Sequence, residues 1–132
     1  MKKKIILIAL TIASIILMLI PGGIAMNFSD GHNIYMIYKS YFSIMPIGYG
    51  NWVPIITAVL SIIILLMHFK NMKKGALIFQ SICTVTSLWS CLMYVPYNGL
   101  LNVTIIGVMI SILNITALIL QIIFYKYRKE AK

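Results

Sequence analysis

Four long apolar segments constrain this chain more than any other feature. Each approaches the length of about 20 residues that a helix needs to cross a bilayer. With 61% hydrophobic and 10% charged residues among 132, the chain has more apolar surface than a soluble domain of this size can bury. The sequence therefore predicts an all-α integral membrane protein, folded as one membrane domain over residues 1–132. We expect a four-transmembrane-helix bundle with spans at about 5–26, 52–69, 75–94 and 103–125, an outer segment at 27–51 and a tail at 126–132.

The first apolar segment allows two interpretations. Three lysines precede the run from Ile5 to Ile20, and Gly23 and Ala25 have the spacing of a signal-peptide cleavage site. Alternatively, the segment continues to Met26 and is long enough to span the membrane. We favour a retained first helix, because cleavage would leave three spans. The sequence alone leaves this choice open, and cleavage would not change the orientation of the remaining chain.

The basic residues gather at one end of the predicted bundle. If both termini lie on the same side, Lys39 is the one basic residue on the other side. Cytoplasmic loops of membrane proteins are enriched in lysine and arginine, so both termini are predicted to be cytoplasmic. The ten cytoplasmic residues are Lys2, Lys3, Lys4, Lys70, Lys73, Lys74, Lys126, Arg128, Lys129 and Lys132.

This distribution of charge also indicates where the protein lies and what it contacts. The net charge of +9 suggests anionic lipid headgroups on the cytoplasmic side as partners, at about 1 kcal/mol for each lysine, and not a nucleic acid. The abundance of Ile, Lys, Asn and Tyr fits an AT-rich bacterial genome. We therefore expect a multi-pass protein of the bacterial cytoplasmic membrane.

The outer segment carries an aromatic pattern with helical spacing. Its apolar residues recur at i, i+3, i+4, i+7, i+8 and i+11, which predicts a short amphipathic outer interfacial helix between spans 1 and 2. Ser29 or Asp30 would cap this helix, and Pro46 would end it. The stripe consists of Ile34, Ile37, Tyr38, Tyr41, Phe42 and Met45.

Aromatic side chains dominate the energetics of binding surfaces, so we interpret the outer segment as a partner-binding surface. The partner would be a larger membrane complex, a peptide arriving from outside, or another copy of the chain as a homo-oligomer. The candidate partner-binding residues are Tyr35, Tyr38, Lys39, Tyr41, Phe42, Tyr49 and Trp52.

Small and polar residues share one face on three of the predicted spans. Thr57, Ser61 and His68 align on the second span, whereas the first span offers only Ala9 and Ala13. Such faces either hold helices together or line a path for a solute. We favour packing, because no ionisable group lies within the hydrocarbon zone, and we expect mid-membrane Asn114 to bond to the third span. The candidate interhelical polar face consists of Gln80, Thr84, Ser87, Ser111, Asn114 and Gln121.

The residues that support catalysis are missing from useful positions. Both acidic residues, Asp30 and Glu130, fall outside the spans. Cys83 and Cys91 are separated by about 12 Å along one helix, too far for a disulfide. His32 and His68 are predicted at opposite membrane surfaces and cannot share a metal. We therefore expect no enzyme activity, cofactor or metal.

One short motif suggests a channel. Ile47-Gly48-Tyr49-Gly50-Asn51-Trp52-Val53-Pro54 resembles the selectivity filter of potassium channels, in which backbone carbonyls coordinate the ion. The stretch departs from that pattern at Pro46, where the family has threonine, and at Asn51, where it has an acidic residue. We interpret its glycines as turn residues.

These observations favour a small non-enzymatic accessory or interaction protein that binds a partner through its aromatic outer segment. The alternative is a small channel or permease that conducts a solute along the polar faces of spans 3 and 4.

Overall fold

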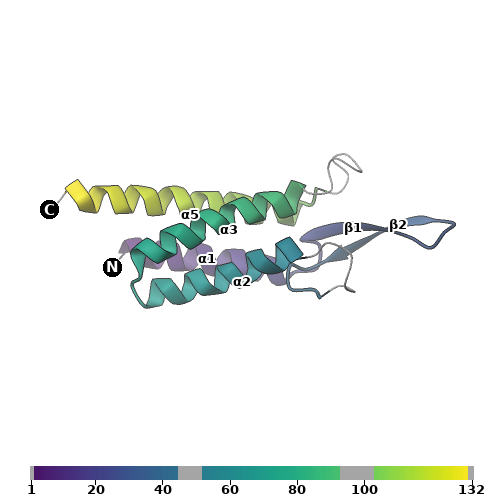
Figure 1. Ribbon diagram of the computed structural model, residues 1–132, viewed down its shortest axis with the longest axis horizontal. Helices are drawn as coiled ribbons and strands as arrows, with labels where there is room; N and C mark the ends of the chain where they lie inside the picture. Colours follow the sequence, from purple (N-terminus) through teal and green to yellow (C-terminus); the bar gives the residue numbers. More distant parts are fainter. Residues whose placement is uncertain (1, 45–51, 93–102, 131–132) are drawn as a thin grey trace.

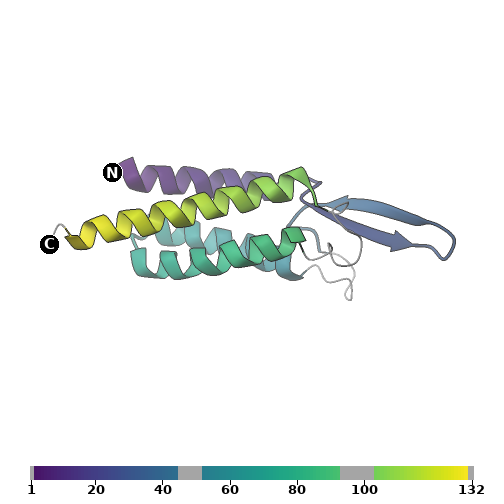
Figure 2. The ribbon, with the colours of Figure 1, turned by 90° about the horizontal axis from the view of Figure 1, so that it is seen from above.

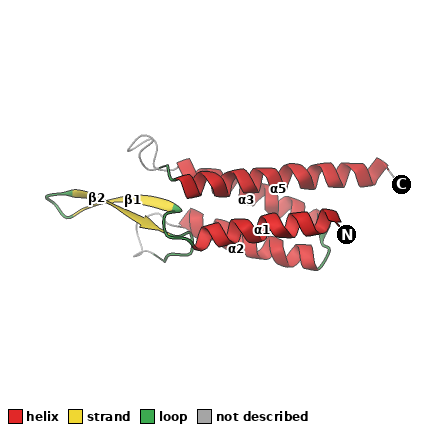
Figure 3. Cartoon of the chain, turned by 180° about the vertical axis from the view of Figure 1, so that it is seen from behind, coloured by secondary structure: helices red, strands yellow, loops and turns green. Residues whose placement is uncertain are grey.

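In the described part of the chain, four helices run side by side, and a β-hairpin extends from one end of them (Figures 1 and 2). The computed structural model describes residues 2–44, 52–92 and 103–130. Figure 3 shows the two strands continuing past the ends of the helices. The elements are α1 (Lys2–Leu19), β1 (Ile24–Ser29), β2 (Ile34–Lys39), α2 (Trp52–Phe69), α3 (Lys73–Leu92) and α5 (Ile105–Glu130).

The helices form a ring in which each packs against two others. Helix α1 contacts α2 and α5, and α3 contacts the same two helices from the opposite side. Both chain ends and the α2–α3 turn lie at the end away from the hairpin (Figure 1). Three helices, α2, α3 and residues Ile105–Tyr125 of α5, are long and apolar enough to cross a membrane. The chain therefore fits a membrane-embedded protein.

The outward faces of these helices are apolar. Val85 and Trp89 on α3 are each 64% exposed, and Ile112 on α5 is 55% exposed. The buried positions are taken mainly by small or polar residues. An exposed apolar surface of this extent is unusual for a soluble monomer but suits contact with lipid chains.

The outer amphipathic helix predicted from the sequence is wrong, because this part of the chain forms a hairpin. Strands β1 and β2 pair antiparallel from Ile24↔Lys39 to Ser29↔Ile34. Asp30 Oδ1 accepts the backbone N–H of His32 at 3.0 Å and that of Asn33 at 2.7 Å, which lowers the pKa of the Asp30 carboxyl. Gly31 follows Asp30 in this turn and has a φ of 91°, a backbone conformation that glycine adopts readily.

The first helix is shorter than expected. It ends at Leu19, so the prediction that the first span continues to Met26 is wrong. Pro21 follows, which cannot continue the hydrogen-bonding pattern of a helix, and Gly22 has a φ of 115°. The chain is thereby redirected, and the residues from Ile24 onward pair with β2.

Hydrogen bonds to two backbone carbonyls attach the base of the hairpin to α1 and to the start of α5. Tyr41 N donates to the carbonyl of Met18 in α1 at 3.0 Å. Thr104 Oγ1 donates to the carbonyl of Gly23 at 2.8 Å and accepts the N–H of Gly107 at 3.0 Å, so it also caps α5.

The ring of Tyr41 fills the end of the bundle beneath the hairpin. Tyr41 is fully buried, and its hydroxyl has no hydrogen-bond partner among the described residues. Burial raises the pKa of Tyr41. A Cβ added at Gly23 would lie 2.8 Å from the ring, so glycine leaves the space that the ring occupies. The surrounding buried cluster contains Met18, Ile24, Met26, Ala58 and Ile110.

This packing predicts opposite outcomes for two substitutions of Tyr41. Tyr41→Ala removes a fully buried ring and should lower the free energy of unfolding by about 3–5 kcal/mol. Tyr41→Phe removes only the unpaired hydroxyl and should leave stability unchanged or raise it by about 1 kcal/mol. Both values are measurable by reversible unfolding in detergent micelles. A Tyr41→Phe variant that unfolds much more easily would show that the hydroxyl has a partner.

Candidate functional site

The residues predicted to bind a partner are divided between surface and core. Tyr38 on β2 is 56% exposed, and Trp52 at the start of α2 is 61% exposed. Lys39 is half-buried, and Phe42 packs against the buried cluster around Tyr41. Of the predicted contact residues, Tyr38 and Trp52 are therefore the two that the described part of the structure shows as exposed.

The other three predicted contact residues are Tyr35, Tyr41 and Tyr49. Tyr41 is buried, so its assignment to a partner-binding surface is wrong. The helical spacing placed it beside Tyr38, whereas in the structure it follows the strand and turns into the bundle. Tyr35 pairs with Phe28 in the hairpin ladder, and Tyr49 lies outside the described residues.

The hairpin presents two strand edges beyond the helices. Its sheet has two strands within the described chain, so each strand has one edge without a neighbouring strand. The tip, from Asp30 to Asn33, is exposed. An isolated two-stranded hairpin is marginally stable in water, so its attachment to α1 and α5 is needed to hold these edges in place.

All six residues predicted for the interhelical polar face lie inside the helix ring. Asn114 on α5 joins the neighbouring helices. Its Oδ1 accepts from Gln80 Nε2 on α3 at 3.1 Å, and its Nδ2 donates to Ser14 Oγ on α1 at 3.4 Å. The expected bond from Asn114 to the third span is thus present, with Gln80 as the donor.

The neighbouring hydroxyl groups are also hydrogen-bonded. Thr84 Oγ1 donates to the carbonyl of Gln80 in its own helix at 2.8 Å. Ser111 Oγ lies 3.2 Å from the carbonyl of Ser87 across the α3–α5 contact and 3.0 Å from the carbonyl of Gly107 in its own helix. Hydroxyl groups that bond to backbone carbonyls in this way permit close helix packing without unpaired donors.

The inward face of α1 differs from the sequence-based expectation. Ala9 is exposed and Ala13 is half-buried, whereas Thr11 and Ser14 are buried. The choice of the alanines was therefore wrong. A usable signal was the spacing of the four buried residues of this helix at i, i+4, i+7 and i+11, which are Leu7, Thr11, Ser14 and Met18.

His68 lies at the end of α2 and is buried together with Thr57 and Ser61, the two residues with which it was predicted to share a face. Its Nε2 lies 3.1 Å from Gln121 Nε2, and because an amide NH2 can only donate, the imidazole Nε2 is the acceptor in the tautomer protonated at Nδ1. Gln121 Oε1 is buried and has no partner among the described residues.

The remaining chemically active groups do not converge in the described part of the chain. Cys83 and Cys91 are free thiols, and no group of three His, Cys, Asp or Glu side chains is placed to hold a metal among the described residues. The filter-like stretch lies mostly at 45–51, outside those residues. No protein-family model, curated protein or solved structure matches this chain.

The Gln80–Asn114 hydrogen bond predicts a measurable coupling between α3 and α5. In a double-mutant cycle of Gln80→Leu and Asn114→Leu, we expect a coupling free energy of about 0.6 kcal/mol and at most about 1.7 kcal/mol, as for other interhelical bonds in membranes. Reversible unfolding in detergent provides the four stabilities. Thr116→Val is the control, since this exposed hydroxyl bonds only within α5, and its coupling to Gln80→Leu should be zero.

Proposed function

We propose that this chain is a small non-enzymatic protein of the cytoplasmic membrane that binds a partner outside the cell through its β-hairpin. The observation that carries the proposal is the position of the hairpin, which projects past the helices at the end opposite both termini (Figure 1). The hairpin is attached rigidly at its base and exposed at its tip, as a recognition element requires.

The orientation in this proposal follows from charge. The three lysines at the start of α1 and those of the α2–α3 turn share one end of the bundle, whereas Lys39 lies at the hairpin end. The positive-inside rule then assigns the termini to the cytoplasm and the hairpin to the outside. Helix α1 has 18 residues, as α2 does, and we propose that it is the fourth span, with its lysines reaching the headgroup region.

The strand edges support one recognition mode in particular. An extended segment of a partner can add to the outer edge of β1 or β2 and form main-chain hydrogen bonds along it. The exposed ring of Tyr38 supplies a side-chain contact next to that edge. A peptide arriving from outside, a subunit of a larger membrane complex and a second copy of this chain would all use the same backbone chemistry.

The competing function is a channel or permease along the polar faces of α3 and α5. Polar side chains on these faces bond to one another and to backbone carbonyls, as with Gln80, Asn114 and Ser111. This pattern favours a role in helix packing. A solute that passed along these faces would have to replace each of these bonds with a bond to itself. We therefore place the hairpin hypothesis first.

Shortening the hairpin tests the proposed binding mode. Replacing residues 27–36 by Asn-Gly keeps the three residue pairings at the base of the hairpin, from Ile24↔Lys39 to Met26↔Ile37. It removes most of both strand edges. We expect the variant to insert and fold, because the buried base is unchanged. A photo-reactive side chain at Tyr38 should form a discrete adduct in intact cells with the full hairpin and lose it with the short one.

The control for this experiment is the same photo-reactive side chain at Met72, which is exposed at the opposite end of the molecule. It should give no adduct that depends on hairpin length. Identical adducts from Tyr38 in the full and shortened proteins would contradict recognition through the strand edges.

The two functions also differ in their response to Asn114→Leu. If the polar faces only pack helices, liposomes that contain the purified protein should release entrapped ions and small solutes no faster than protein-free liposomes. This should hold for the original protein and for Asn114→Leu. The variant should lose only stability, by about 1–3 kcal/mol. Solute release that depends on the protein and changes in Asn114→Leu or Thr84→Val would favour the permease.

A further inference from the structure

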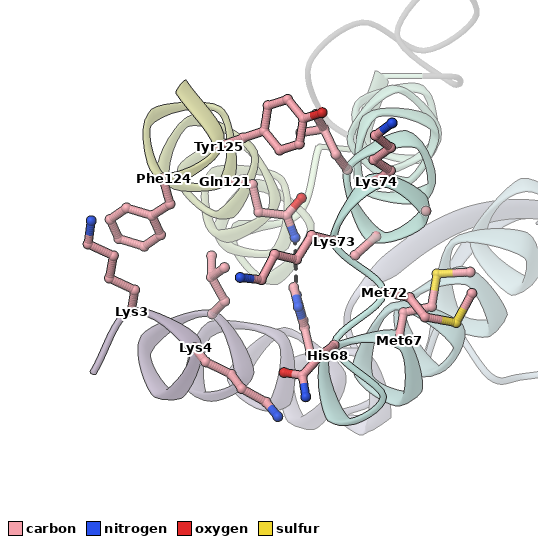
Figure 4. Close-up of a pocket in the computed structure, with 15 residues that line it drawn as sticks. Lys3, Lys4, Met67, His68, Met72, Lys73, Lys74, Gln121, Phe124 and Tyr125 are labelled. Carbon is pink, nitrogen blue, oxygen red and sulfur yellow. Dashed lines mark hydrogen bonds between the residues drawn. The ribbon is translucent and has the colours of Figure 1, made fainter. Parts of the chain in front are cut away.

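A cavity opens between the helices at the end opposite the hairpin. It has a volume of about 1070 Å³ and is lined by α1, by α5 and by both sides of the α2–α3 turn. Figure 4 shows the hydrogen-bonded pair of His68 and Gln121 in the middle of this cavity, with lysines spread around it. The cavity is large for inorganic phosphate and is slightly larger than the range of about 300–1,000 Å³ seen for organic ligand sites.

The cavity is strongly basic. Four lysines line it, and no acidic residue is among the described residues of its wall. Lys4 Nζ donates to the carbonyl of Phe69 at 3.3 Å, and Lys3 Nζ lies 5.2 Å from the centre of the Phe124 ring. In Figure 4, Lys73 extends toward the His68–Gln121 pair. These charges repel one another, so an anion between them would lower their electrostatic energy.

The start of α3 adds to this preference for an anion. Asn71, with a φ of 58°, closes α2, and Met72 N donates to the carbonyl of Met67 in a Schellman arrangement. Helix α3 then begins at Lys73, whose N–H donates to the carbonyl of Asn71 at 3.0 Å, after Met72, which has no side-chain oxygen to cap the first turn. Lysines in the first turn are unfavourable beside the positive end of the helix dipole. A phosphate oxygen would interact favourably with the lysines and with this end of the dipole.

A buried acceptor marks the inner part of the same cavity. Gln121 is 6% exposed, and its Oε1 has no hydrogen-bond partner in the described chain. A buried carbonyl oxygen without a donor is less favourable than a bonded one. A ligand that combines a phosphate with a hydroxyl group would satisfy the lysines and this oxygen together. If the amide is rotated, it presents Nε2 as a donor to the phosphate instead.

The walls identify the source of the phosphate. Leu7, Met67 and Phe124 place apolar surface beside the charged groups. The cavity also lies at the ends of helices that are long and apolar enough to span a membrane, and the ends of spanning helices meet the lipid headgroups. Free phosphate would leave this apolar surface in water, whereas a glycerophospholipid would cover it.

We propose that this cavity binds the headgroup of one anionic glycerophospholipid with free hydroxyl groups, such as phosphatidylglycerol. The lysines hold the phosphate, the buried Gln121 accepts from a headgroup hydroxyl, and the lipid chains lie against the outer faces of the helices. The site is independent of the hairpin and of its proposed partner. It is a single, saturable site, in contrast to general attraction between lysines and an anionic surface.

The test uses the full chain in detergent and native mass spectrometry to count bound molecules. The probes are dioctanoyl-phosphatidylglycerol, dioctanoyl-phosphatidylcholine and inorganic phosphate. Three variants are compared: Lys73→Gln and Gln121→Leu in the cavity, and Lys70→Gln as a matched control. Lys70 lies in the same turn and is exposed but does not line the cavity, so its substitution removes the same charge without altering the site.

We expect one phosphatidylglycerol per chain at saturation. Lys73→Gln should weaken its binding at least about fivefold, the factor that corresponds to about 1 kcal/mol for one lysine. Gln121→Leu should also weaken it, whereas Lys70→Gln should change it by less than about twofold. The proposal is overturned if lipids accumulate without saturation or if Lys70→Gln and Lys73→Gln have equal effects. Equal binding of phosphatidylcholine, or displacement of the lipid by inorganic phosphate at similar concentration, would also overturn it.

Discussion

The need to satisfy backbone hydrogen bonds where water is scarce governs the architecture of this protein. Within a bilayer, an unpaired N–H or C=O costs several kcal/mol, so a chain can leave a helix only where other groups replace the lost bonds. Helix α1 ends at Leu19, and Tyr41 N then supplies a donor to the carbonyl of Met18. Thr104 supplies another to the carbonyl of Gly23. The hairpin is therefore part of the helix ends and not an appended loop.

The two ends of the helix ring differ in a way that follows from their side chains. At the hairpin end, the ring of Tyr41 and its apolar neighbours close the space between α1, α2 and α5. At the opposite end, four lysines, His68 and Gln121 are among the residues that line a cavity. One end is therefore closed by the chain itself, and the other is open and basic.

The sequence predicted the helices better than the segment between the first two. The inward faces of α3 and α5 were identified because lipid is uniformly apolar, so any polar residue at helical spacing has to turn inward. The stripe at residues 34–45 was ambiguous, since Ile and Tyr are strand formers and also fit a helical period. The deciding signal was Asp30-Gly31, which was interpreted as a helix cap although it is a hairpin turn.

The candidate sites were predictable to different degrees for a related reason. Gln80 and Asn114 were found because a polar amide in an apolar run needs a partner. The burial of Tyr41 and the pairing of His68 with Gln121 could not be derived, because each depends on contacts between distant segments. Aromatic residues are equally common at interfaces and in cores, so composition does not separate the two.

The double attachment of the hairpin has a mechanical consequence. Force applied at its tip is carried through the β ladder to the Met18 carbonyl on α1 and to Thr104 at the start of α5, two helices that contact each other. A movement of the hairpin should therefore be coupled to α1 and α5 through these bonds and the buried Tyr41 ring. A pull or tilt of the hairpin tip would be transmitted into the relative position of α1 and α5 and would not be absorbed by a slack connection.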